Sequence, residues 1–306
     1  MCGKLGTALA LLSLVAAMLC GCAQRPAKPA NVIHATVSVV PQQYFVQRIG
    51  GEHVEVNVMV LPGASPATYE PKPAQLTALA QAEVYFSIGV PFEDAWLAKI
   101  ASANKDMMLV DTIAGIDRLP MEAHHHDEAE AEAQAGSEHG GGAPNPHVWL
   151  SPELVKVQSQ AIYEALAQLD PAHKGVFEAN LEAFIADIDA LEAEIETTLS
   201  GLSSGKFMVF HPAWGYFARD FGLEQIPVEV GGQEPSPREL ALLIETARQE
   251  GIQVIFAQPE FSTEDAETIA QEIGGQVLLI SPLAPDWLQN LRNVAQTFAD
   301  VLKRES

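Results

Sequence analysis

Residues 174–202 read KGVFEANLEAFIADIDALEAEIETTLSGL, and their pattern organises the rest of the chain. Apolar side chains recur along this stretch at steps of three and four residues: Phe177, Leu181, Phe184, Ile188, Leu191 and Ile195. This spacing is typical of an amphipathic α-helix. The pattern runs well beyond the ~11–12 residues of an average helix in a globular protein. We therefore predict a connecting helix over residues 171–203 that joins two lobes.

Before this helix, segments with the character of strands alternate with segments of helical character. The strand-like segments are VIHATVSVV, HVEVNVMV, VYFSIG and MMLVDT. Helices are expected from about Tyr44 to Ile49 and in AQLTALAQA, FEDAWLAKIASA and SPELVKVQSQAIYEALAQLD, the last of which begins with Ser-Pro. This alternation indicates an α/β lobe with a largely parallel sheet over residues 32–170.

The same alternation returns after the long helix. Strands are expected in KFMVF, EQIPVEV, QVIFAQ and VLLI, and helices in WGYFARDF, PSPRELALLIETARQEG, TEDAETIAQEIGG and WLQNLRNVAQTFADVLKRE. A second α/β lobe is thus predicted over residues 204–306. The predicted fold class is α/β, with two α/β lobes of mostly parallel strands joined by one long helix. Ligands of such folds bind at the carboxyl ends of strands or between lobes.

The first residues are typical of an exported protein. MCGKLGTALALLSLVAAMLCGC has one basic residue and then an apolar run that is too short for an anchor helix. Its ending, LCGC, resembles a bacterial lipobox, which predicts a signal peptide over residues 1–21 and lipidation of Cys22. Residues 22–31 would then be a polar tether, and the protein would lie outside the cytoplasm, anchored by lipid in the periplasm or on the outer face of the cell membrane. An ordinary signal peptide with incidental cysteines is the alternative.

Composition narrows the possible functions. A formal net charge of −23 argues against nucleic acid as a partner, because phosphates require a basic surface. The 48% hydrophobic residues are enough for a real core. The cysteines are Cys2, Cys20 and Cys22, so the mature chain would have no thiol beyond its first residue. Any metal site must therefore use histidine and carboxylate.

Two histidines occupy positions that suit a binding site. His211 directly follows the expected strand KFMVF, where loops commonly carry function. His147 stands in NPHVWLSP, between a proline and bulky residues, which can hold an imidazole in one direction. Each position also suits a histidine that packs in the core or caps a helix.

The sequence offers little for catalysis. It contains no G-x-S-x-G, no H-E-x-x-H and no glycine-rich phosphate loop. The glutamates of the long helix are expected on its solvated face. A zinc hydrolase would need an open metal position and a nearby glutamate base, and no motif supplies them. We therefore expect a binding protein rather than an enzyme.

Five segments occur in a characteristic order across nearly the whole mature chain. They are GASPATYEPKPAQL, NPHVWLSPE, HPAWGYFARDFGL, GQEPSPREL and ISPLAPDWLQNL. Together they resemble the cluster A-I substrate-binding proteins of zinc and manganese ABC importers. The resemblance implies two α/β lobes with little hinge motion, a divalent metal ion held between them, and a membrane permease as partner. A monomer is expected.

The resemblance also implies which residues bind the metal. His147 matches the histidine of the family motif D-P-H-x-W, with Asn145 in place of the acid, and His211 matches that of H-x-A-x-G-Y-F. The first family histidine falls on Ala67, and the last family acid falls on Ser281. An alanine cannot bind metal, and a serine hydroxyl is a poor ligand for Zn²⁺.

Three explanations for the missing donors remain open. The first is that a carboxylate such as Glu70, Glu234 or Asp286 supplies a metal donor. The second is that the loop over residues 122–143 supplies it, and the third is that the site between the lobes binds the metal ion only weakly. Relatives of this type often carry a histidine-rich insertion at the position of that loop. It is too polar and rich in glycine to fold alone. Its possible auxiliary metal ligands are His124, His125, His126 and His139.

The expected function is capture of a divalent cation for an ABC importer. Zn²⁺ is the expected ion, because the retained ligands are imidazoles, whereas manganese favours carboxylates. The alternatives are a Mn²⁺- or iron-binding protein of the same family and a metal-dependent adhesin or metal chaperone.

Overall fold

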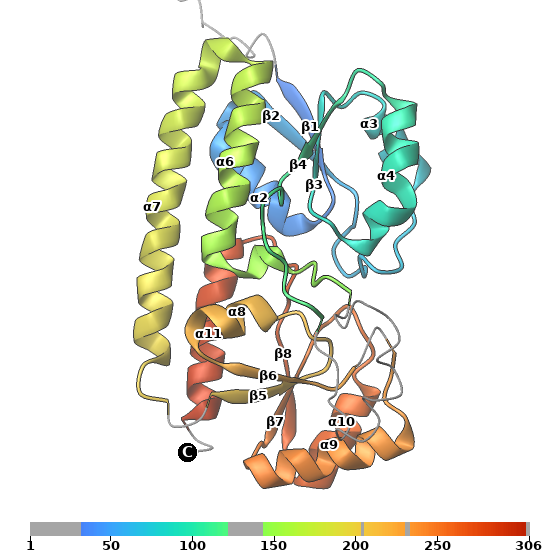
Figure 1. Cartoon of the computed structure of the whole chain (residues 1–306), viewed down its shortest axis with the longest axis vertical. Helices are drawn as coiled ribbons and strands as arrows, with labels where there is room; N and C mark the ends of the chain where they lie inside the picture. The colour runs from blue at the N-terminus through green and yellow to red at the C-terminus, as the bar shows by residue number, and fades with distance from the viewer. Residues whose placement is uncertain (1–31, 122–142, 203–204, 230–232, 304–306) are drawn as a thin grey trace, which may run out of the picture. The chain divides into compact units, whose positions relative to one another are not determined.

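Two parallel sheets of four strands form the centres of two lobes (Figure 1). In the first sheet the strands lie in the order β2-β1-β3-β4, and every neighbouring pair is parallel. The second sheet has the equivalent order, β6-β5-β7-β8, again with parallel pairs only. The strands are β1 (Ile33–Val37), β2 (Val54–Val58), β3 (Val84–Ser87), β4 (Met108–Asp111), β5 (Lys206–Val209), β6 (Glu224–Pro227), β7 (Val254–Ala257) and β8 (Gln276–Leu279). The predicted fold class is confirmed.

The computed structural model describes residues 32–121, 143–202, 205–229 and 233–303. The predicted signal peptide, Cys22 and the tether lie outside these residues. So do the loop histidines His124, His125, His126 and His139, and nearly all of the predicted loop 122–143. The lobe boundaries at residues 170 and 204 stay predictions.

Helices connect the strands and cover the sheets. Those of the first lobe are α2 (Val40–Gly50), α3 (Pro73–Leu79), α4 (Pro91–Ala103) and α6 (Pro152–Leu169), and those of the second are α8 (Gly215–Phe221), α9 (Pro237–Glu250), α10 (Glu264–Ile273) and α11 (Trp287–Leu302). Single 3₁₀ turns occur at η2 (Gly51–His53), η3 (Val148–Leu150) and η4 (Pro171–His173). Several helices start with proline, whose missing N–H costs nothing in the first turn. The Ser151 hydroxyl caps α6 by accepting a bond from Leu154 N at 3.2 Å.

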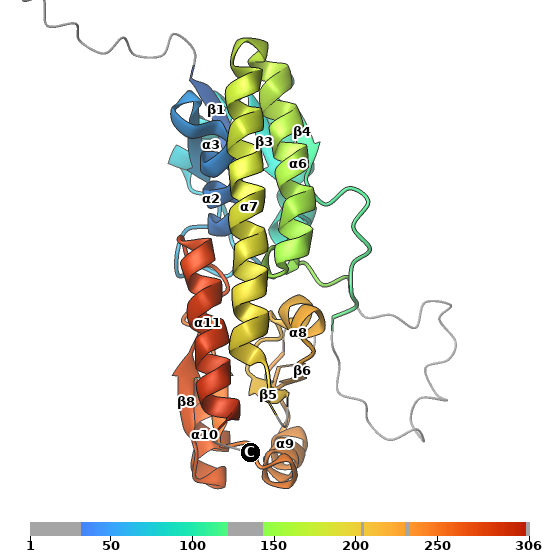
Figure 2. The same ribbon diagram turned by 90° about the vertical axis from the view of Figure 1, so that its left-hand side faces the viewer.

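The long helix α7 (Lys174–Leu199) connects the two lobes. It packs against α2 and α6 of the first lobe and against α8 and α11 of the second (Figure 2). A long connecting helix is thus present, as predicted, but it spans Lys174–Leu199, and the residues just before it form the separate 3₁₀ turn η4. Along α7 the residues that set the helical period are buried, from Phe177 to Ile195. Their burial is what the amphipathic pattern predicts.

The two sheets share one apolar core. A single cluster of buried side chains includes the first sheet, α7, the strand β5 and the helix α11. At its centre the ring of Trp287 lies 5.2 Å from that of Phe45 and 6.3 Å from that of Phe184. A smaller cluster lies between the second sheet and α9 and α10. Consistent with the shared core, the chain from Ile33 onward groups as one compact unit.

No helix in the described part of the chain is long and apolar enough to cross a membrane.

Candidate metal site

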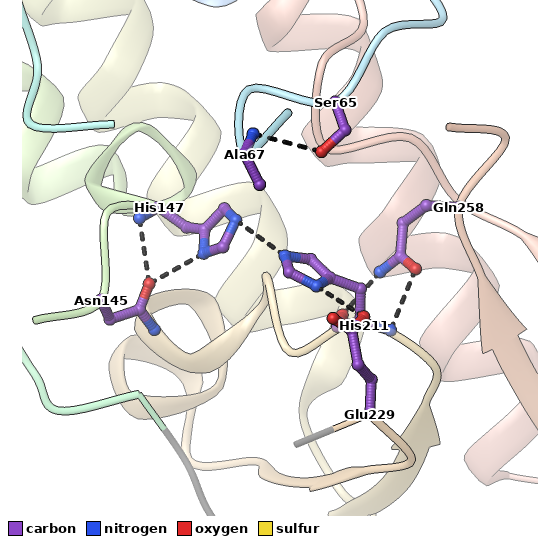
Figure 3. A network of polar contacts seen from close by, with 7 residues as sticks. All are labelled: Ser65, Ala67, Asn145, His147, His211, Glu229 and Gln258. Atoms are coloured by element: carbon purple, nitrogen blue, oxygen red, sulfur yellow. Dashed lines mark hydrogen bonds and ion pairs between the residues drawn. The ribbon is translucent and has the colours of Figure 1, made fainter. Parts of the chain in front are cut away.

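His211 lies at the carboxyl end of β5, two residues beyond the last strand residue, Val209. The side chain of Gln258, at the end of the neighbouring strand β7, holds the backbone of His211 through two hydrogen bonds. The Oε1 atom of Gln258 accepts a hydrogen bond from the His211 N–H at 3.2 Å, and its Nε2 donates to the His211 carbonyl at 2.7 Å (Figure 3). The imidazole also stacks on the ring of Phe261, with centroids 4.6 Å apart. The fold therefore fixes both the main chain and the ring plane of His211.

The Nδ1 atom of His211 is bonded to Glu229, which follows β6. Its distance to Glu229 Oε2 is 2.9 Å, and Glu229 is only 5% exposed. A carboxylate only accepts hydrogen bonds, so Nδ1 carries the proton and the lone pair is on Nε2. A carboxylate behind a histidine in this way fixes the tautomer and raises the basicity of a metal ligand.

His147 is oriented by an equivalent device with a neutral partner. The Oδ1 atom of Asn145 accepts from the His147 backbone N–H at 3.0 Å, so this atom is the amide oxygen. The same atom lies 2.8 Å from His147 Nδ1, which must then donate to it. Asn145 is itself buried, and its backbone carbonyl accepts a hydrogen bond from the hydroxyl of Tyr216 at 3.0 Å. The lone pair of His147 is therefore also on Nε2.

The two free imidazole nitrogens face each other. Nε2 of His147 lies 3.3 Å from Nε2 of His211, as Figure 3 shows. In the tautomers that carry both protons on Nδ1, the two Nε2 lone pairs face each other at this distance. A tetrahedral Zn²⁺ ion with Zn–N bonds of about 2.0–2.1 Å holds two ligand nitrogens about 3.3–3.4 Å apart. The separation thus fits two corners of a tetrahedral zinc site.

The surroundings of His147 favour its neutral imidazole. Burial lowers the pKa of His147 well below its ordinary value, and the neighbouring His211 lowers it further. A neutral histidine is the form that binds metal, so the environment of His147 keeps its lone pair available.

The residues at the other two family positions contribute no strong donor. Ala67 lies on the loop before α3, exposed, and in Figure 3 its methyl group points toward the pair of imidazoles. The hydroxyl of Ser281 is used twice: it bonds Glu260 Oε1 at 3.2 Å and accepts from Leu283 N at 3.2 Å. Neither residue therefore offers an unused donor atom in this arrangement.

Sequence reasoning missed two carboxylates at this site. Glu229 and Glu260 lie two and three residues beyond the ends of β6 and β7, and β5, which precedes His211, lies between these two strands in the sheet. The carboxyl ends of parallel strands meet at one edge, so the rule that singled out His211 also applies to both of them. Burial raises the pKa of Glu260. Hydrogen bonds from its own backbone and from Ser281 oppose the rise, and so does the electrostatic effect of the neighbouring His211.

The carboxylates considered as replacements are placed differently. Asp286 caps α11, where its Oδ1 accepts from Gln289 N at 3.1 Å. Glu70 and Glu234 are exposed. Among the hydrogen bonds and ion pairs of the described residues, none joins these three acids to His147 or His211.

The base of the histidine-rich loop lies beside His147. The N–H of Met121 donates to the carbonyl of Ala143 at 2.8 Å, and that of Asn145 donates to Leu119 O at 2.7 Å. The hydroxyl of Tyr216, in turn, accepts from Leu119 N at 3.0 Å. The two ends of the loop are therefore paired with each other and fixed to α8.

Known proteins are similar to this chain in fold and in sequence over most of its length. A crystal structure of ZnuA is 46% identical, covers 89% of this chain and 100% of its own, and superposes with a TM-score of 0.80. A zinc-bound deletion mutant of ZnuA gives 46% identity, coverage of 89% and 98%, and a TM-score of 0.79. The high-affinity zinc uptake system protein ZnuA of Bacillus subtilis is 28% identical over 258 residues, or 82% of this chain and 78% of that protein. The model of the family described as "zinc-uptake complex component A periplasmic" matches residues 35–301, and the chain belongs to this family.

Proposed function

We propose that this chain captures Zn²⁺ outside the cytoplasm and delivers it to the membrane permease of an ABC importer. His147 and His211 bind the ion through Nε2. One observation carries this assignment of ligands: the two Nε2 atoms lie 3.3 Å apart while both Nδ1 atoms are engaged by oxygen acceptors. Two preoriented lone pairs at the edge length of a zinc tetrahedron suit Zn²⁺ better than any hydrogen-bonded role.

The chemistry of the donors favours zinc over the alternatives. Manganese and iron sites of this class would be expected to offer more carboxylate and a higher coordination number. Here two imidazoles occupy the centre, and the carboxylate of Glu229 is bonded to Nδ1 of His211. Mn²⁺ and Fe²⁺ are therefore expected to bind more weakly than Zn²⁺.

Membership of a zinc-uptake family supports a role in binding the ion. His147 and His211 are the residues assigned to it. The ending LCGC supports lipidation of Cys22 and attachment to a membrane, with residues 22–31 as the tether. One copy of the chain supplies both histidines, so a monomer is sufficient for the site.

Titration of the mature protein with Zn²⁺, followed by calorimetry and by competition with a chelating dye, tests this function. We expect one tight site, which the double variant His147→Ala/His211→Ala loses. His34→Ala is the matched control, because the His34 side chain is 53% exposed on β1 and should be dispensable. A wild-type protein that binds Zn²⁺ no more tightly than ~100 µM would sink the proposal.

A further inference from the structure

Two imidazoles supply only half of the donors that Zn²⁺ takes in a tetrahedral site. Of the two remaining family positions, Ala67 has no donor atom, and the Ser281 hydroxyl is already bonded to Glu260 and to Leu283 N. The site therefore needs a donor from elsewhere in the chain, and Glu260 is the residue that Ser281 contacts.

The carboxylate of Glu260 lies against the residue that replaces the family acid. Ser281 Oγ donates to Glu260 Oε1 at 3.2 Å, and the carbonyl of Ser281 is held by Asn290 Nδ2 at 2.8 Å. In relatives with an acid at the position of Ser281, the carboxylate would extend from the chain just after β8. Here the carboxylate of Glu260 comes from the end of the neighbouring strand β7 and contacts the Ser281 side chain. A carboxylate is therefore present at this place in the fold, although another residue supplies it.

Two residues that flank Glu260 along the chain, Gln258 two positions before it and Phe261 directly after it, contact His211. Gln258 exchanges two hydrogen bonds with the His211 backbone, and Phe261 stacks on its imidazole at 4.6 Å. The segment that carries Glu260 is thus fixed against the ligand histidine from both sides.

The second carboxylate oxygen has no partner. Oε2 of Glu260 is buried and accepts no hydrogen bond from the described residues, whereas Oε1 is bonded to Ser281. Leaving a buried polar oxygen unpaired costs about 1–3 kcal/mol, and more when it is charged. A bound cation removes this cost, because it pairs the charge and accepts the unused lone pair of Oε2.

We propose that Glu260 is the third protein ligand of the bound Zn²⁺ and coordinates it through Oε2. The donor set is then His147, His211 and Glu260, with Ser281 orienting the carboxylate through Oε1. Three protein ligands leave one zinc position for water or for an exchanging group. This inference rests on the proposed function, since it specifies the ligands of the same site.

The variant Glu260→Gln tests it with Zn²⁺ alone as the probe. Loss of a charged ligand is expected to weaken binding at least about 100-fold, beyond the 10–100-fold typical of groups behind a ligand. Glu264→Gln is the matched control, because Glu264 is an exposed acid at the start of α10 in the same lobe. In the Glu260→Gln background, Ser281→Asp returns a carboxylate to the family position and is expected to restore most of the affinity.

A zinc-loaded crystal structure with anomalous scattering provides the second measurement. We expect Glu260 Oε2 within about 2.0–2.2 Å of the ion. Wild-type affinity in Glu260→Gln, or a carboxylate more than about 3 Å from the zinc, would overturn the inference and leave the proposed function standing. Failure of the wild-type protein to bind Zn²⁺ would instead overturn the proposed function. A third outcome would also overturn the inference. Glu260→Gln would weaken binding, Ser281→Asp would not restore it, and the zinc-loaded structure would show the ion bound by the two histidines alone. Glu260 would then have an orienting role.

Discussion

The indole Nε1–H of Trp287 donates a hydrogen bond of 2.6 Å to the backbone carbonyl of Trp149. Trp149 in turn donates through its own Nε1–H to the carbonyl of Pro282 at 2.8 Å. Both indoles are buried, and Trp149 stands only two residues after His147. The segment that carries His147 is thus bonded to the start of α11, which fixes the position of this proposed ligand relative to the second lobe.

Replacing Trp287 by alanine is expected to lower the free energy of unfolding by about 3–5 kcal/mol, the usual cost of removing a large buried aromatic side chain. Because the two lobes share one core, the variant should still unfold in a single transition. Chemical denaturation followed by circular dichroism measures both quantities. Trp96→Ala is the control, since Trp96 is only partly buried and should cost much less. Two separate transitions in the wild-type protein would contradict the shared core.

Glu229→Gln is expected to weaken Zn²⁺ binding about 10-fold, because the amide holds His211 less firmly and leaves its imidazole less basic. The number of sites per protein should not change. A dye competition assay gives the affinity, and calorimetry gives the stoichiometry. The control is Glu224→Gln, because Glu224 is an exposed acid at the start of β6, the strand that precedes Glu229. An unchanged affinity would mean that the 2.9 Å bond between Glu229 and His211 does not tune the ligand.

Ala67→His is expected to tighten Zn²⁺ binding by about 10-fold or more, because it adds an imidazole from the loop above the two histidines. The exposed position of Ala67 leaves space for the larger side chain. The neighbouring variant Thr68→His controls for a histidine added anywhere on this loop. Equal effects of the two variants would show that position 67 does not face the site.

Deleting residues 122–142 is expected to leave the affinity of the cleft site unchanged within about 3-fold and to remove only weaker additional zinc equivalents. Met121 and Ala143 are already paired through a backbone hydrogen bond of 2.8 Å, so a short glycine linker can join them without disturbing Asn145. Calorimetric titration of both proteins decides the matter. Disappearance of the tight site would contradict the assignment of His147 and His211.

Asp170 links stability to pH at the end of α6. Its Oδ2 lies 2.5 Å from Nδ1 of His173, and this hydrogen bond lowers the pKa of the Asp170 carboxyl. A lowered pKa means that the ionised form stabilises the fold above the unfolded pKa of about 3.9, and that this stabilisation is lost as pH falls through the folded value. Asp170→Asn should therefore cost about 1 kcal/mol at neutral pH and progressively less below pH ~4. Denaturation at several pH values, with the exposed Asp106→Asn as control, measures the difference.

The repeating elements were predictable from the sequence because they are local. Short stretches of the sequence are enough to show the helical period of α7 and the alternation of strands and helices, and the structure has both. The start of α2 was placed too late, near Tyr44. Strand β1 and the first turn of α2 form one apolar run in the sequence, and burial on all sides conceals the change of period.

The site was predictable only in part. His147 and His211 stand out through their motifs, and the structure brings their Nε2 atoms together. Glu229 and Glu260 have no comparable local signature, because their roles depend on partners 18 and 21 residues away in neighbouring strand ends. Only the order of strands in the sheet reveals that these loops meet.

The common core of the two sheets has a consequence for how a partner recognises the loaded protein. Lobes that are packed together are expected to close little on a ligand, so filling the site should change the outline of the molecule little. On the proposed assignment, what changes is the local charge, which rises by two when a divalent cation binds to His147 and His211. A permease that distinguishes the full carrier from the empty one would therefore sense an electrostatic difference near the two histidines and not a change of shape.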